Sequence, residues 1–179
     1  NLKIFRMLND IKHFFTISFP TLSILFLIFI NIFVSNNFYD FGQLFVFQAI
    51  FFWILYTPKL LPLPIILIVG VLQDIIYFSP IGSTALIFFF LVFLFDKYNK
   101  LFLEPSFVEL FSSFIVLFII GTVAFWGLNS IINLKVLPIN ISLVYEILLN
   151  LFFFPLNYFV LHIFYKKLIL EIKKYKKNV

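Results

Sequence analysis

Asp74 is the residue whose type and position most clearly suggest chemistry in this chain of 179 residues. It lies within the apolar segment VGVLQDIIY, residues 69–77. A carboxyl group in hydrocarbon is costly unless it is paired, neutral or hydrated, so it marks a functional or structural contact. The alternative is that Asp74 lies near the outer end of a helix and touches water or lipid headgroups. The cost of burial favours the contact.

A second polar feature comprises Glu146, Asn150 and Asn157. At 100° per residue, these positions fall within about 40° of each other on one helix face. A polar stripe on a membrane helix is expected to face protein or water. The stripe therefore predicts either a pocket or partner interface, or ordinary packing inside a bundle. Pro155 lies between Asn150 and Asn157 and is expected to bend the helix.

The remaining polar residues do not form a catalytic pattern. His13 and His162 lie far apart in sequence, with no set of metal ligands around them. Asp96 and Glu109 are interpreted as solvated or helix-capping residues. The chain has no cysteine, which excludes disulfides, thiolate metal sites and cysteine nucleophiles. The motifs of nucleotide-binding loops, zinc proteases and serine hydrolases do not occur. We therefore expect no enzyme, no cofactor and no metal.

The elements that position these residues follow from composition. Hydrophobic residues make up 63% of the chain and charged residues 12%, and the mean hydropathy is +1.12. A soluble protein needs a polar surface and contains about twice this share of charged residues. Each membrane-spanning helix uses roughly 20 apolar residues. The chain is therefore predicted to be an all-α integral membrane protein, with one transmembrane domain of about six helices and no separate soluble domain.

Six apolar runs mark the predicted spans, at about residues 14–34, 41–56, 60–78, 83–95, 107–128 and 141–165. The third and fourth runs are short and are joined by Ser79-Pro80-Ile81-Gly82, whose Pro and Gly positions fit a tight turn. These two runs therefore predict a tight helical hairpin. Ser106 and Glu109 form a capping box for the fifth run. Residues 166–179 form a basic tail.

The distribution of Lys and Arg predicts the orientation. If both termini face the cytoplasm, only Lys135 of the 13 basic residues falls outside. This asymmetry fits the positive-inside rule and requires an even number of spans. The lysines of the tail would then contact anionic lipids. Because topology accounts for the basic charge, nucleic-acid binding is not expected.

The segment GVLQDIIYFSPIGSTAL, residues 70–86, resembles the signature of the rod shape-determining protein MreD family. The matching positions are Gly70, Asp74, Ser79, Pro80, Gly82, Ala85 and Leu86. The last run is similar as well, through residues 145–150 (YEILLN), Pro155 and the basic pair at 166–167. The resemblance covers the whole chain in layout and these two segments in motif. Gln73 and the abundance of Phe depart from many family members.

The resemblance implies a multi-pass protein of the bacterial inner membrane. It implies a non-enzymatic scaffold or regulator of the cell-wall elongation complex, which controls rod shape and lateral peptidoglycan synthesis. The implied direct partner is the single-pass protein MreC. The MreB filament, the RodA glycosyltransferase and a penicillin-binding transpeptidase are implied indirect partners. The bundle is also expected to be similar to the substrate-binding S component of energy-coupling-factor transporters.

We hypothesise that the third, fourth and last helices form the surface that binds the partner. The residues expected to shape this interface are Gly70, Asp74, Ser79, Pro80, Gly82, Glu146, Asn150 and Pro155. The alternative function is a substrate-binding membrane subunit of a vitamin-type transporter. In that case Asp74, Glu146 and Asn150 would line a ligand pocket between broken helices. A polytopic enzyme is a third possibility, which the scarcity of polar residues disfavours.

Overall fold

The computed structural model describes residues 2–35, 43–98, 106–136, 138 and 141–178. Within these ranges the chain is helical and contains no strand, which confirms the predicted all-α class. The elements are α1 (Leu2–Ser35), α2 (Gln43–Tyr56), the 3-10 helix η1 (Pro58–Leu60), α3 (Leu63–Ile76), α4 (Ser83–Tyr98), α5 (Phe107–Ile132) and α6 (Ile141–Asn178). Residues 41 and 42, where the second predicted run begins, lie outside the described ranges.

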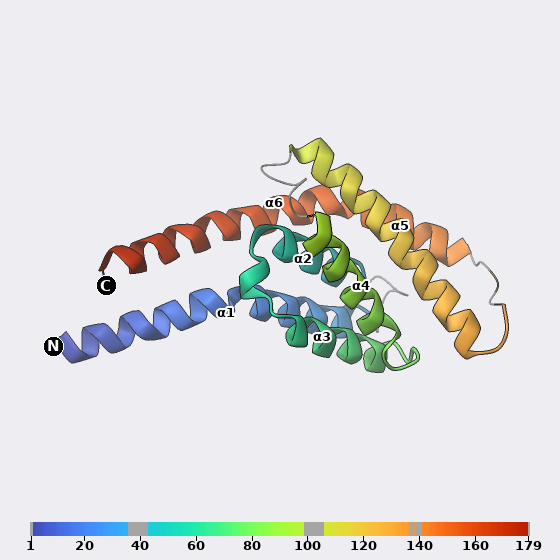
Figure 1. The fold of residues 1–179 in the computed structure, drawn as a ribbon, viewed down its shortest axis with the longest axis horizontal. Helices are drawn as coiled ribbons and strands as arrows, with labels where there is room; N and C mark the ends of the chain where they lie inside the picture. Colours follow the sequence, from blue (N-terminus) through green and yellow to red (C-terminus); the bar gives the residue numbers. More distant parts are fainter. Residues whose placement is uncertain (1, 36–42, 99–105, 137, 139–140, 179) are drawn as a thin grey trace.

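The first and last helices are longer than the predicted spans. α1 begins at Leu2, and α6 continues through the basic tail to Asn178. The tail is helical because residues 166–178 are mostly Lys, Leu, Ile and Glu, with no Pro or Gly to stop the helix. Pro20 and Pro155 lie inside continuous helices. Both helices extend beyond the bundle on the same side, so the two termini lie at one end (Figure 1).

α2 is the centre of the bundle. Residues 46–54 are buried without interruption, and α1, α4 and α6 all pack against this helix. A helix that is apolar all round is expected in such a position. Aromatic rings fill much of the space around it. Phe114 of α5 and Phe154 of α6, for example, stack with ring centroids 4.1 Å apart.

α3 and α4 form the predicted hairpin and are the most closely packed pair of helices. α3 starts directly after Pro62, and Pro64 occupies its first turn, where a missing N–H costs nothing. The backbones approach closely at Gly70. A Cβ atom placed there would lie 2.5 Å from Cα of Ala85. Only glycine allows this distance between α3 and α4.

α5 begins with the predicted capping box. The Ser106 amide donates to Oε2 of Glu109 at 2.8 Å, and the Glu109 amide donates to Oγ of Ser106 at 3.4 Å. Both bonds satisfy amides that a helix start leaves free. The helix ends at Ile132, a turn beyond the predicted end of this run.

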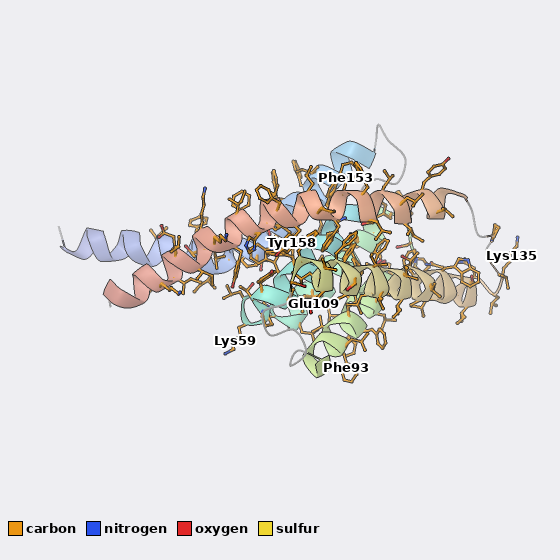
Figure 2. The ribbon with its side chains drawn as sticks, turned by 90° about the horizontal axis from the view of Figure 1, so that it is seen from above. Lys59, Phe93, Glu109, Lys135, Phe153 and Tyr158 are labelled. Atoms are coloured by element: carbon orange, nitrogen blue, oxygen red, sulfur yellow. The ribbon has the colours of Figure 1, made fainter. Side chains whose placement is uncertain are left out.

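Two helical segments in the described part of the chain are long and apolar enough to cross a membrane, Phe107–Ile132 and Ile147–Lys173. The shorter apolar helical segments are Phe14–Ile30, Phe45–Tyr56, Leu63–Ile76 and Ser83–Leu94. Lys135 lies at the end of the bundle opposite to the termini, whereas Lys59 and Glu109 lie toward the termini (Figure 2).

Candidate functional site

The carboxyl group of Asp74 organises the turn between α3 and α4. The side chain is fully buried, with 0% of its surface exposed. Oδ1 accepts hydrogen bonds from Oγ of Ser79 at 2.8 Å, from Oγ of Ser83 at 3.2 Å and from the Thr84 amide at 3.1 Å. Oδ2 accepts one from the Gly82 amide at 2.7 Å. Both oxygens are therefore occupied by donors of the same hairpin.

This arrangement caps α4 from a neighbouring helix. A helix start leaves amides without partners and carries partial positive charge. The N-cap side chain usually satisfies these amides, but here Asp74 of α3 reaches across to Gly82 and Thr84. Of the two interpretations of Asp74, the structure favours the buried contact.

The turn lies where the sequence predicts it, but its hydrogen bonds differ from those of a simple four-residue turn. The Ser83 amide bonds to the Pro80 carbonyl at 3.1 Å. The Gly82 amide donates to the Asp74 carboxyl group and not to a turn carbonyl. Gly82 has a φ of 98° and Phe78 a φ of 52°. The first value suits glycine, while the second is unusual for a bulky residue.

Gln48 connects α2 to α6 through the second polar cluster. Its Nε2 donates to the backbone carbonyl of Asn150 at 3.0 Å and to Oδ1 of Asn150 at 3.2 Å. Its Oε1 accepts from Nδ2 of Asn157 at 3.0 Å. All three side chains are buried. Asn150 and Asn157, the two members of the polar stripe whose side chains are described, therefore face another helix of the same chain.

Sequence reasoning missed Gln48. The signal was available, because Gln48 is a polar residue in the middle of the second apolar run, where hydrocarbon would leave its amide without partners. The side chain of Glu146, the third member of the predicted stripe, lies outside what the structure describes.

The two polar clusters are separate. Asp74 bonds within the α3–α4 hairpin, whereas Asn150 bonds to Gln48 on α2. α4 and α6 each pack against α2 (Figure 1). The structure therefore does not bring Asp74 and Asn150 together around one pocket.

A third group of polar side chains lies where the C-terminal end of α2 meets the middle of α6. The hydroxyl oxygens of Tyr56 and Tyr158 are 2.8 Å apart and share a hydrogen bond. The ring of His162 stacks on Tyr158 with centroids 5.5 Å apart. Among the side chains that the structure describes, no three His, Cys, Asp or Glu residues are grouped as metal ligands.

These features define a helical membrane protein in which the buried side chains of Gln48 and Asp74 join helices to one another. The chain belongs to the MreD family: the family model described as rod shape-determining protein MreD matches residues 7–168. The resemblance drawn from residues 70–86 is thereby confirmed. Searches of curated proteins and of solved structures found no match. The predicted similarity to transporter S components therefore stays a prediction.

Membership of this family gives the protein a role in rod-shape determination at a membrane. The family is one of shape-determining proteins rather than a known enzyme family.

Proposed function

We propose that this chain is a non-enzymatic scaffold or regulator of the cell-wall elongation complex in the bacterial inner membrane. Its α-helices would cross the membrane six times, with both termini in the cytoplasm. The family match over residues 7–168 supports the role in rod shape. The position of both termini at one end of the bundle supports the even number of crossings (Figure 1).

The use of Asp74 as an internal cap is the observation that carries the proposal. Both of its oxygens accept hydrogen bonds within the hairpin, and none of its surface is exposed. A residue in this state fixes the shape of α3 and α4 and has no free lone pair directed at a substrate. The most prominent polar group of the sequence is thus structural, as a scaffold requires.

The partner would bind to the outward face of the α3–α4 hairpin. The exposed apolar side chains of α4 follow helical spacing, as do those of α3: Leu86, Phe89, Phe90 and Phe93 on α4, and Ile68, Leu72 and Ile75 on α3. Helices associate within membranes through close packing rather than through hydrophobicity alone. A rigid hairpin surface therefore suits the transmembrane helix of a single-pass partner such as MreC.

We place this docking surface on α3 and α4 without α6, because α6 packs mainly against α2, α1 and α5. Asn150 and Pro155 would then contribute to the stability of the bundle and not to the interface. The MreB filament, the RodA glycosyltransferase and the penicillin-binding transpeptidase would be reached through the single-pass partner.

A pull-down from native membranes in mild detergent, analysed by mass spectrometry, tests the proposal. The full chain should recover a single-pass membrane protein together with cell-wall synthases. The double variant Phe89→Ala/Phe90→Ala should lose this partner. The double variant Phe152→Ala/Phe159→Ala is the matched control, because it removes two exposed rings from α6, and it should retain the partner.

Two results would count against the proposal. Equal recovery by both double variants would show that α4 is not the docking surface. Recovery of a transporter ATPase pair, with no cell-wall protein, would replace the scaffold by the transporter subunit. The structure offers no specific support for that alternative, since Asp74 and Asn150 hydrogen-bond to different helices.

A further inference from the structure

The turn between α3 and α4 exposes two large apolar side chains. Phe78 is 97% exposed and Ile81 is 76% exposed. The segment between the two helices, residues 77–82 (YFSPIG), carries no charged side chain. In water, two large apolar side chains in such a position would be unfavourable. The composition of this tip therefore suits contact with hydrocarbon.

The lengths of the helices place the tip below the outer membrane surface. α3 has 14 residues and, at 1.5 Å per residue, spans roughly 21 Å. The hydrocarbon layer is about 30 Å thick, and any tilt shortens the reach of a helix further. α5 has 26 residues and spans roughly 39 Å. Along the long axis, the α3–α4 turn stops short of the C-terminal end of α5 (Figure 1).

Charged residues hold the open end of the hairpin at the inner interface. The difference between the length of the hairpin and the thickness of the hydrocarbon layer therefore lies on the outer side. The exposed Lys59 precedes α3, and the last turn of α4 includes Asp96 and Lys97 in its sequence. Charged residues are costly in the hydrocarbon layer. They therefore hold the open end of the hairpin at the inner interface, and the turn cannot shift outward to reach water.

Several amides of the turn find their partners within the protein. The amides of Tyr77 and Ser79 bond to the carbonyls of Gln73 and Asp74 at 2.9 and 3.0 Å. The amides of Gly82 and Thr84 bond to the Asp74 carboxyl group, and Pro80 has no amide hydrogen. Backbone at membrane depth must find its partners within the protein. The internal cap supplied by Asp74 meets this requirement for the amides of Gly82 and Thr84.

We infer that the tip of the α3–α4 hairpin ends inside the hydrocarbon layer, where Phe78 and Ile81 contact the acyl chains of outer-leaflet lipids. A span shorter than the bilayer is accommodated by local thinning of the lipid. The outer leaflet would therefore be depressed above this hairpin and not beside α5. This inference is independent of the partner of the scaffold.

Depth measurement with single spin labels tests the inference directly. The chain has no cysteine, so Phe78→Cys, Ile81→Cys and Leu134→Cys each provide one labelling site in the full protein in phospholipid vesicles. Leu134 is the matched control. It is 93% exposed, has a φ of 50° and lies in the turn after α5, beside the exposed Lys135.

The labels at positions 78 and 81 should collide often with oxygen, which concentrates in lipid, and rarely with a water-soluble nickel chelate. Their oxygen-to-nickel collision ratio should exceed that at position 134 several-fold. They should lie roughly 5 to 10 Å below the outer interface, given the difference between helix length and layer thickness.

Two outcomes would overturn the inference. Access of the nickel chelate at positions 78 and 81 equal to that at position 134 would place the tip in water. Exclusion of both oxygen and the chelate would show that protein covers the tip, in place of lipid. Similar collision ratios at positions 78 and 81 would show that neither label has distorted the turn locally.

Discussion

Asp74 and Gln48 stabilise the bundle by satisfying groups that lipid cannot satisfy. Asp74 joins the end of α3 to the start of α4, and Gln48 joins α2 to α6. Asp74 could be found from the sequence, because a lone carboxyl group in an apolar run has a high cost. Its partners could not be identified in the same way. Those of Gln48 lie 102 and 109 positions away along the chain.

The variant Asp74→Asn should destabilise the protein by about 2 kcal/mol. The amide keeps the shape of the side chain, but its NH₂ group would face a backbone N–H in either orientation, that of Gly82 or that of Thr84. Ser79→Ala should have a smaller effect, because it removes one donor and leaves the others. Unfolding titrations in detergent micelles measure both variants. Wild-type stability of Asp74→Asn would show that the cap contributes little.

At the scale of the element, turn and capping residues predicted the structure well. The capping box at Ser106 and the turn at Pro80–Gly82 both appear where the sequence indicates them. Helix ends near charged segments were less predictable. Hydropathy marks where a membrane run ends, but the lysine-rich tail is itself a good helix former. α6 therefore continues past the predicted end of its span.

The close approach of α3 to α4 predicts that Gly70 cannot be replaced by alanine without loss of stability, whereas Gly127 of α5 can. In Gly70→Ala the new Cβ would lie 2.5 Å from Cα and 2.7 Å from the amide nitrogen of Ala85. Backbone atoms cannot rotate away, so the helices must separate, and we expect a loss of about 1–3 kcal/mol. Gly127→Ala is the control. A Cβ there meets nothing within 4 Å, so this change should be neutral or stabilise α5 by up to about 1 kcal/mol.

Unfolding measurements on both glycine variants decide the point. If Gly70→Ala is as stable as Gly127→Ala, the close approach of α3 and α4 at Ala85 is not a feature of the folded protein in its membrane.

At the scale of the whole molecule, the sequence predicted the all-helical class and the family, since both depend on composition and on a local motif. It did not predict that α2 would be the buried centre, with α1, α4 and α6 packed against it. That arrangement depends on which apolar faces pack together. In a chain that is apolar nearly everywhere, periodicity does not distinguish a face directed at lipid from one directed at protein.

The positions of the basic residues predict the orientation of the bundle. Lys59 and Lys135 are exposed and lie toward different ends of the molecule (Figure 2), so each can be replaced by a single cysteine. In intact cells, a membrane-impermeant thiol reagent should label Lys135→Cys and leave Lys59→Cys unmodified until the membrane is opened. The opposite pattern would reverse the orientation and would contradict the positive-inside rule in this chain.

The docking of a single-pass partner on the α3–α4 hairpin is the central claim, and cross-linking in living cells tests it most directly. A photoreactive amino acid would replace Phe90 on α4 or Phe159 on α6, both of which are exposed. The account predicts that position 90 forms a cross-link to a single-pass membrane protein of the cell-wall complex and that position 159 does not. A cross-link to that protein only from position 159, or from neither position, would contradict the account.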